Sequence, residues 1–217
     1  MSSKKHDKSV SIIILVRHGH TPTTGKILPG RAKGLHLSEL GKEQASKVAT
    51  NLSMLENVKA VYASPMERTL ETAKPIASAF GLRVQRNRGL IEADFGKWTG
   101  RKLSDLRKLS DWEIVQKNPS LFRFPDGESF IEIQSRMVET ITRISDKHRG
   151  ETVIAVSHAD AIKAFLTAML GTPLDLFQRL YISPCSVSPV ILGDGSPFVL
   201  AVNASGANIS SLLGGNR

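Results

Sequence analysis

The sequence predicts an α/β protein, a three-layer sandwich in which helices cover both faces of a mainly parallel central sheet. Short apolar runs rich in β-branched residues alternate along the chain with longer segments whose apolar residues recur every three or four positions. No internal repeat or low-complexity linker interrupts this alternation. Because a helix that joins two buried parallel strands packs against their sheet, the alternation favours one sheet with right-handed crossovers.

The first part of the chain predicts strands and helices in strict alternation. The run 12–16 is apolar throughout, as expected of a strand buried on both faces, so we place it in the centre of the sheet. Ser38 precedes the first helical segment and Gly81 follows the second. The predicted elements are the strands 12–16, 58–62 and 82–84 and the helices 39–55 and 66–80.

The middle third of the chain, residues 89–124, is irregular and predicts an excursion from the sheet with two short helical stretches. Regular patterns then return. Gly150 breaks a long amphipathic segment, and Gly171 with Pro173 ends another. The expected elements are short helices around 103–109 and 111–116, a long helix from 126–129 to about 148, a strand 152–156, a helix 159–170 and β-like runs over 179–202.

The composition is that of a globular protein, with 41% hydrophobic and 23% charged residues in 217. We predict one domain over residues 10–205, a disordered leader over residues 1–9 and a flexible tail over residues 206–217. The leader carries lysines, but no small-residue cleavage site follows, and no apolar stretch reaches the roughly 20 residues that cross a bilayer. A single cysteine, Cys185, permits no intrachain disulfide, so we expect a cytoplasmic protein with no membrane partner.

Lysine and arginine exceed aspartate and glutamate by 29 to 20, giving a formal charge of +9. This excess favours an anionic partner, which nucleic acid, anionic lipid and phosphorylated small molecules all satisfy. The basic residues are not interleaved with base-stacking aromatics, so nucleic acid is not the expected partner.

Five polar residues follow the predicted strands, at the edge of an open α/β sheet where ligands bind. Arg17 and His18 follow the first strand, Arg68 the second, Glu92 the third and His158 the late strand. Two guanidiniums can bind the oxygens of a phosphoryl group, one imidazole can attack phosphorus, and the other can donate to the developing charge. The set therefore predicts a phosphoryl-transfer site.

The segment 15–21, LVRHGHT, resembles the signature of the histidine phosphatase superfamily, also called the phosphoglycerate mutase-like family. Further marks of that family follow in order and cover most of the chain. They are LSELG at 37–41 with Gln44-Ala45, ASP at 63–65 with Arg68-Thr69 and Thr72-Ala73, EADFG at 92–96 with Trp98 and Gly100, DGES at 126–129, and VSH at 156–158.

The resemblance implies that His18 is the nucleophile and becomes a phosphohistidine, while Arg17, Arg68 and His158 form the phosphate pocket. Glu92 lies where the family's proton donor usually lies. The two guanidiniums should hold His18 neutral, and Glu92 needs burial or a nearby dianion to stay protonated. The resemblance also implies a small phosphorylated substrate and no metal or cofactor, in keeping with a sequence that has no metal-ligand spacing.

The chain departs from the family pattern at three positions of the expected phosphate-binding loops. Thr24 stands where Asn is common, Pro29 replaces a Ser or Thr before Gly30, and Ala159 follows His158 in place of Gly. Thr24 can still donate through its hydroxyl, whereas Pro29 has neither hydroxyl nor N–H. We expect Thr24, Gly30 and Ala159 to take part in phosphate binding.

Three functions stay open. The segment 95–100 resembles phosphatase-like branches of the family, and 175–179 with 183–188 resembles a bacterial subgroup labelled probable phosphomutase. The first hypothesis is a phosphomonoesterase, the second a phosphomutase and the third a non-catalytic polyanion-binding protein. The late, weakly charged strands form either a homodimer edge or the end of the sheet.

The remaining candidates have weaker patterns. We expect His20 and His36 to be solvated loop residues and His6 and His148 to lie on the surface. Trp98 either lines the pocket or serves packing. The arginines that alternate near the third strand, Arg83, Arg86 and Arg88, are expected to face water.

Overall fold

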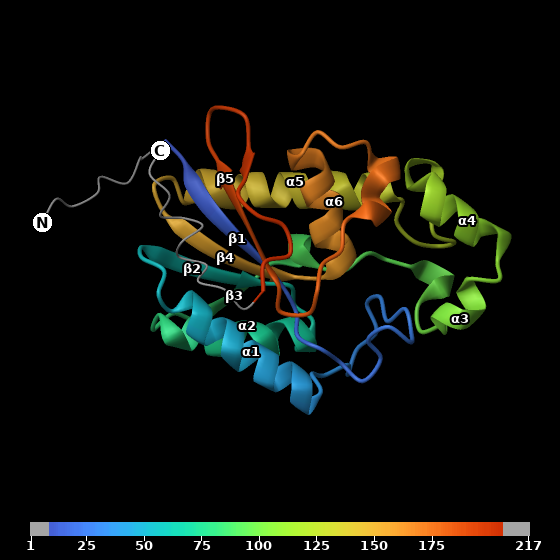
Figure 1. The fold of residues 1–217 in the computed structure, drawn as a ribbon, viewed down its shortest axis with the longest axis horizontal. Coiled ribbons are helices and arrows are strands. Elements are labelled where there is room, and N and C mark those ends of the chain that lie inside the picture. Colours follow the sequence, from blue (N-terminus) through green and yellow to red (C-terminus); the bar gives the residue numbers. More distant parts are fainter. Residues whose placement is uncertain (1–8, 206–217) are drawn as a thin grey trace, which may run out of the picture.

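The computed structural model describes residues 9–205. Their strands form one sheet in the order β3-β2-β4-β1-β5-β6, which is the middle layer of the protein (Figure 1). The strands β1 to β4 are parallel, and β5 and β6 add an antiparallel edge. Their bounds are β1 Ser11–Arg17, β2 Val58–Ala63, β3 Val84–Arg86, β4 Thr152–Ser157, β5 Val187–Leu192 and β6 Phe198–Val199.

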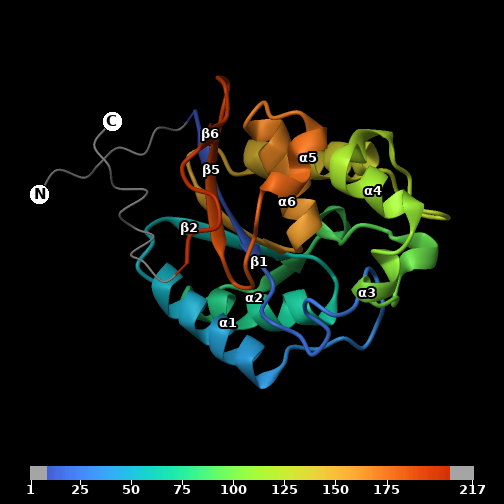
Figure 2. The same ribbon diagram turned by 45° about the vertical axis from the view of Figure 1, so that its right-hand side comes forward.

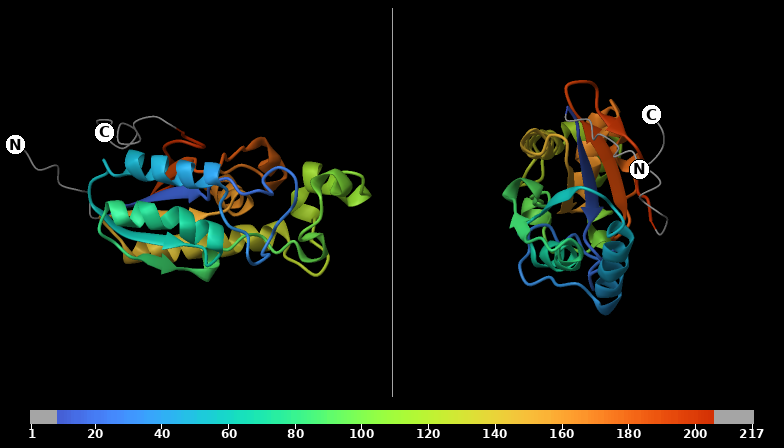
Figure 3. Two further views of the ribbon diagram at one scale, coloured as in Figure 1. Left: turned by 90° about the horizontal axis from the view of Figure 1, so that it is seen from below. Right: turned by 90° about the vertical axis from the view of Figure 1, so that its left-hand side faces the viewer.

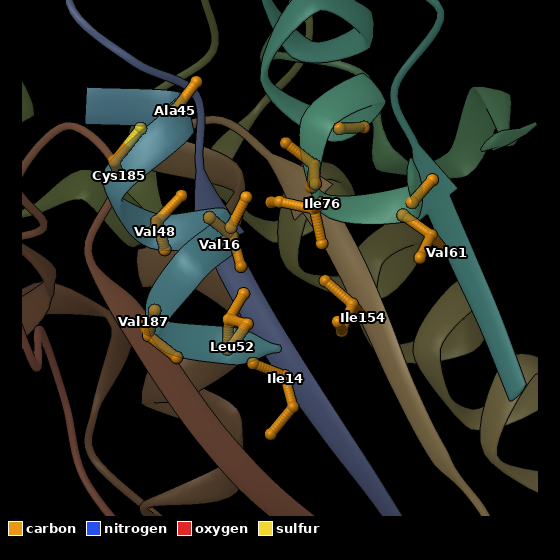
Figure 4. Close-up of a cluster of buried hydrophobic side chains, with 14 of the residues drawn as sticks. Ile14, Val16, Ala45, Val48, Leu52, Val61, Ile76, Ile154, Cys185 and Val187 are labelled. Atoms are coloured by element: carbon orange, nitrogen blue, oxygen red, sulfur yellow. The ribbon is translucent and has the colours of Figure 1, made fainter. Parts of the chain in front are cut away.

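Two pairs of helices cover the opposite faces of the sheet (Figure 3). On one face α1 (Glu39–Leu52) and α2 (Glu67–Ala79) pack over the strands, and on the other lie α5 (Phe130–Lys147) and α6 (Ala159–Met169). Successive residues of β1 serve the two cores in turn, because side chains alternate across a strand. Ile14 and Val16 face α1, as Figure 4 shows, whereas Ile13 and Leu15 face α5 and α6. The three-layer prediction is confirmed.

The excursion lies beyond the carboxyl ends of the parallel strands, where α3 (Leu103–Leu106) and α4 (Ser110–Lys117) stand apart from the sheet (Figure 2). A core of aromatic rings holds it together and packs it on η4 (Leu174–Arg179) and the start of α5. Trp98 is 3% exposed and contacts Trp112, Phe122 and Phe124. Of the two roles that the sequence allowed for Trp98, the structure therefore shows packing.

Most predicted elements agree with the structure to within three residues at each end, but one strand is shifted as a whole and one histidine is buried instead of exposed. The third strand is β3, two residues later than expected, because Leu82 still bonds back to Ala77 at the end of α2 and pairing with β2 starts at Val84. His148 is buried rather than on the surface. Its Nε2 lies 3.0 Å from the Tyr62 hydroxyl, and its Nδ1 lies 2.7 Å from Glu151 Oε2.

Of the predicted leader, only Ser9 is among the described residues, and the predicted tail at 206–217 lies outside them. Within residues 9–205, none of the helices has both the length and the apolar character to span a membrane. The single-domain boundaries stay a prediction.

Candidate active site

The two motif histidines meet because their strands are neighbours. Strands β1 and β4 are parallel and paired in register, with Arg17 opposite Ser157, so the chain leaves both strands at the same edge. His18 and His158 are the next residues, and their ring centroids lie 5.2 Å apart. The sequence expectation that topology gathers these residues is confirmed for this pair.

His18 is held in one orientation by the backbone of the next residue, Gly19. Its Nδ1 lies 2.8 Å from the carbonyl oxygen of Gly19, so Nδ1–H donates and Nε2 carries the lone pair. That Nε2 accepts from Arg68 Nε at 3.3 Å. Burial, and then the charges of Arg68 and Arg17, hold the pKa of His18 well below its usual value, so the ring is neutral.

The chain must pass very close to another segment to place His18. A Cβ built on Gly19 would lie 2.6 Å from the carbonyl oxygen of Gly41, which excludes any side chain there. The Gly19 N–H donates to Thr72 Oγ1 at 3.0 Å. These contacts join the segment that carries His18 to α1 and α2 at once.

The two arginines present unused donors. Arg68 is fully buried in the first turn of α2, where its Nη2 donates to Gly30 O at 2.9 Å and to His158 Nδ1 at 3.1 Å. Arg17 Nη1 donates to Ile182 O at 2.6 Å. Arg68 Nη1 and Arg17 Nε are buried without a partner among the described residues. A buried donor without an acceptor costs free energy, so these unpaired N–H groups of Arg17 and Arg68 suit an anionic ligand.

His158 is completely buried between polar groups. Its Nδ1 accepts from Arg68, which can only donate, so Nε2–H donates to Ser64 Oγ at 2.8 Å. Burial, followed by the charges of Arg68, His18 and Arg17, lowers the pKa of His158 well below its usual value. The ring is therefore neutral.

Glu92 completes the cluster, with Oε2 3.9 Å from His158 Nδ1. Its Oε1 accepts from the Ala93 N–H at 2.9 Å. Burial, and after it the negative charge of Asp160, raises the pKa of Glu92 to about 7, against the lowering effect of Arg68 and Arg17. The carboxyl group is thus poised to hold or release a proton near neutral pH.

The structure brings together five of the predicted residues: Arg17, His18, Arg68, Glu92 and His158. Gly30 joins them through its carbonyl oxygen, which accepts from Arg68. Its φ of +50° and the 2.9 Å approach of Thr99 Oγ1 to an added Cβ both require glycine. Ala159 opens α6, where first-turn N–H groups have no acceptor within the helix.

Thr24 has a local role in the structure. Its Oγ1 accepts from the Thr21 N–H at 2.9 Å and lies 3.0 Å from Thr21 Oγ1, so the hydroxyl closes the loop on itself. His20 is part-buried and bonds Ser38 Oγ at 2.8 Å through Nδ1, unlike the solvated residue expected. His36 is exposed as expected and pairs with Glu71.

Sequence reasoning missed three residues around the site. Ser64 lies in a quoted motif, but its bond to His158 depends on strand order. Asp160 follows His158 by two residues and acts on the pKa of Glu92. Arg31 follows Gly30, and its contacts reach segments far away in the sequence. Only adjacency to motif residues could have pointed to the last two. Across the described part of the chain, no three or more His, Cys, Asp or Glu side chains are grouped as metal ligands.

Comparisons with known proteins agree with this geometry. The model of the histidine phosphatase superfamily (branch 1) matches residues 13–205, and the chain belongs to that superfamily. It is 31% identical to phosphoserine phosphatase 1 of Hydrogenobacter thermophilus over 196 residues, which cover 88% of this chain and 91% of the relative.

Other relatives carry a different activity in their names or none. The probable phosphoglycerate mutase GpmB of Yersinia pestis is 30% identical over 181 residues, covering 82% of this chain and 83% of the relative. The solved structure of Bacillus stearothermophilus YhfR superposes with a TM-score of 0.83 at 28% identity, covering 92% of this chain and 99% of that one. The relatives thus include one named as a phosphatase and one named as a probable mutase.

Proposed function

We propose that the protein is a phosphomonoesterase that acts on a small phosphorylated metabolite through a phosphohistidine on His18. The observation that carries the proposal is the neutral His18 ring, whose Nε2 lone pair lies against the buried guanidinium of Arg68. A neutral imidazole is a nucleophile, and an anion is the ligand that the unpaired donors of Arg68 and Arg17 require.

In the first step the substrate phosphate takes the free donors of Arg17 and Arg68. The Nε2 lone pair of His18 attacks phosphorus, the N–P bond forms, and the P–O bond to the alcohol breaks. Glu92 gives its proton to the leaving oxygen, so the alcohol departs neutral and Glu92 becomes a carboxylate. The Nδ1–H bond to Gly19 O stabilises the positive charge that develops on the ring.

In the second step a water molecule attacks the phosphohistidine. The Glu92 carboxylate takes a proton from the water, the new O–P bond forms, and the N–P bond breaks with its electron pair returning to Nε2. Inorganic phosphate leaves, and Glu92 is protonated again. A carboxyl group with a pKa of about 7 suits both halves, because it is near balance between its two forms at neutral pH.

The test is hydrolysis of p-nitrophenyl phosphate by the wild type and by His18→Ala. We expect the variant to lose at least about 10³-fold in kcat, since no other nucleophile occupies that position. A rapid quench should trap an acid-labile phosphoenzyme in the wild type alone. His36→Ala, an exposed histidine, is the matched control and should keep wild-type rates. Undiminished turnover by His18→Ala would overturn the proposal.

A phosphomutase is the second candidate, favoured by the similarity to the Yersinia pestis protein. The first step is unchanged, and the phosphoryl group then returns from His18 to another hydroxyl of the bound substrate. Measuring isomerisation and phosphate release side by side on 3-phosphoglycerate separates the two. Phosphoserine is the first substrate to try for hydrolysis, because a phosphoserine phosphatase is among the relatives.

Other parts of the function stay predictions. They are the cytoplasmic location, the homodimer, the independence from metal and cofactor, and the absence of nucleic-acid binding. A non-catalytic polyanion-binding protein would bind RNA or DNA in a salt-sensitive way without hydrolysing phosphate esters.

A further inference from the structure

Two acidic side chains in family motifs, Asp94 and Glu128, take no part in the proposed chemistry. They join the loop that carries Glu92 to the loop before α5. The Asp94 N–H donates to Glu128 Oε2 at 3.0 Å, and the Glu128 N–H donates to Asp94 O at 2.9 Å. Glu128 therefore lies directly behind the segment from which the Glu92 side chain enters the site.

Arg31 fixes the same segment from the opposite loop with all three parts of its guanidinium. Its Nε donates to the backbone carbonyl of Glu92 at 2.8 Å. Its Nη1 lies 3.1 Å from Asp94 Oδ2, and its Nη2 lies 2.9 Å from Glu128 Oε2. A lysine has one ammonium group and cannot reproduce this fork.

A second arginine anchors the network to α5. Arg136 donates to both oxygens of Glu128 at 3.0 Å and, through Nη1, to the carbonyls of Gly89 and Ile91 at 2.8 and 2.9 Å. Burial alone raises the pKa of Glu128, but the bonds from Arg136 and Asp94 N–H outweigh it and bring the pKa below its usual value. Glu128 is therefore a fixed negative charge at the centre of the network.

The position of Arg31 in the chain links the two halves of the site. Its neighbour Gly30 offers a carbonyl oxygen to Arg68 at 2.9 Å, while Arg31 itself holds the backbone of Glu92. Two successive residues thus contact the phosphate-binding arginine and the proton donor. The loop 21–34 sets the spacing between them.

We propose that Arg31 is a positioning residue that holds Glu92 at the distance required for protonating the leaving oxygen. The inference rests on the proposed function, because it assigns Arg31 to one step of that chemistry. A carboxyl group displaced by about 1 Å loses much of its value as a general acid. Phosphate binding and the attack by His18 use other groups and should persist.

This role predicts a dependence on the leaving group. A p-nitrophenolate leaves readily without a proton, whereas an alkoxide needs one. Losing Arg31 should therefore harm the hydrolysis of an alkyl phosphate such as phosphoserine or glycerol phosphate much more than that of p-nitrophenyl phosphate. Glu92→Gln, which removes the acid itself, should show the same difference between the two esters with a larger loss on the alkyl ester.

The experiment compares Arg31→Met, Arg31→Lys and Glu92→Gln on both kinds of ester, with inorganic phosphate as competitive inhibitor. We expect kcat/KM, which reports the transfer of the phosphoryl group to His18, to fall about 30-fold for the alkyl ester in the Arg31 variants and less than about threefold for p-nitrophenyl phosphate. The attack of water on the phosphohistidine also uses Glu92 but is the same for both esters, so kcat does not separate them. The inhibition constant of phosphate should stay within about twofold of wild type. Arg143→Met is the control, because Arg143 forms an exposed ion pair on α5.

The outcomes separate the inference from the function that it rests on. Equal losses of kcat/KM on both esters, no loss on either, or weaker phosphate inhibition in parallel with the loss would each overturn the positioning role. If Arg31→Met does not fold, Arg31→Lys keeps the charge and decides alone. The proposed function fails instead if His18→Ala hydrolyses p-nitrophenyl phosphate as fast as the wild type does.

Discussion

The site at the strand ends and the excursion beyond it are built on different principles. Arg17, His18 and His158 are placed by β1 and β4, and the pairing of these strands fixes their spacing. The excursion has no sheet of its own, and aromatic packing with one charged network holds it. Functional side chains that directly follow a strand can be predicted from the sequence. Those held by loops depend on contacts between residues far apart in the chain, which the sequence does not show.

The largest effect is expected from Arg68, where α2 supplies a donor to the strand-end site. Arg68→Gln removes the buried charge, the donor to His18 and the unpaired Nη1 that the proposed function assigns to the substrate phosphate. We expect kcat/KM to fall about 10³-fold, or about 4 kcal/mol of transition-state stabilisation. Steady-state kinetics with p-nitrophenyl phosphate measure this loss. Arg83→Gln, at an exposed position, should leave the rate unchanged, and an equal loss in both variants would point to a general effect of charge.

The next prediction concerns the aromatic core of the excursion. Phe124 is buried against Phe95, Trp98, Phe122 and Phe130. Phe124→Ala should lower the free energy of unfolding by about 3 kcal/mol because it leaves a cavity among rings that cannot close it. Urea unfolding measures the change.

Leu121 provides the control for this prediction. It lies in the same segment with 81% of its surface exposed, so Leu121→Ala should cost less than about 0.5 kcal/mol. A loss below about 1 kcal/mol in Phe124→Ala would mean that the excursion is only loosely joined to the sheet, which would change the comparison between the two regions.

The difference between the regions explains how far the sequence could be interpreted. The apolar runs and the residues just after them predict β1, β4 and the five clustered side chains, since period and topology suffice for both. Arg31 has no such signal, because its partners Glu92 and Glu128 lie some 60 and 100 positions away. The surface prediction for His148 is wrong for the same reason, because its buried partner Tyr62 lies on β2, far away in the sequence.

A smaller effect tests how a charge on α6 acts on the proton donor Glu92, which lies in the excursion. The negative charge of Asp160, in the first turn of α6, raises the pKa of Glu92, so Asp160→Asn should lower that pKa. Glu92 acts first as an acid, and its protonated form would then be lost at lower pH. The basic limb of the kcat/KM profile should shift towards lower pH, with activity at pH 8 falling roughly threefold for a shift of half a unit.

The control for this shift is Asp146→Asn. Asp146 lies on α5, pairs with Arg149 and is not among the groups that act on Glu92. Its profile should coincide with that of the wild type. A basic limb that moves to higher pH in Asp160→Asn, or does not move, would contradict the electrostatic role of Asp160.

The smallest effect on catalysis is expected at Thr24, where the family resemblance and the structure assign different roles to one hydroxyl. The resemblance places Thr24 against the phosphate, but its Oγ1 accepts from Thr21 N–H and bonds Thr21 Oγ1. If closing the loop is the whole role, Thr24→Val costs about 1 kcal/mol of stability and changes KM less than about threefold. If the hydroxyl also binds phosphate, KM and the inhibition constant of phosphate rise together by about tenfold. Because Pro29 offers neither hydroxyl nor N–H, the first result would assign phosphate binding to the free donors of Arg17 and Arg68, with the loop acting through the carbonyl of Gly30.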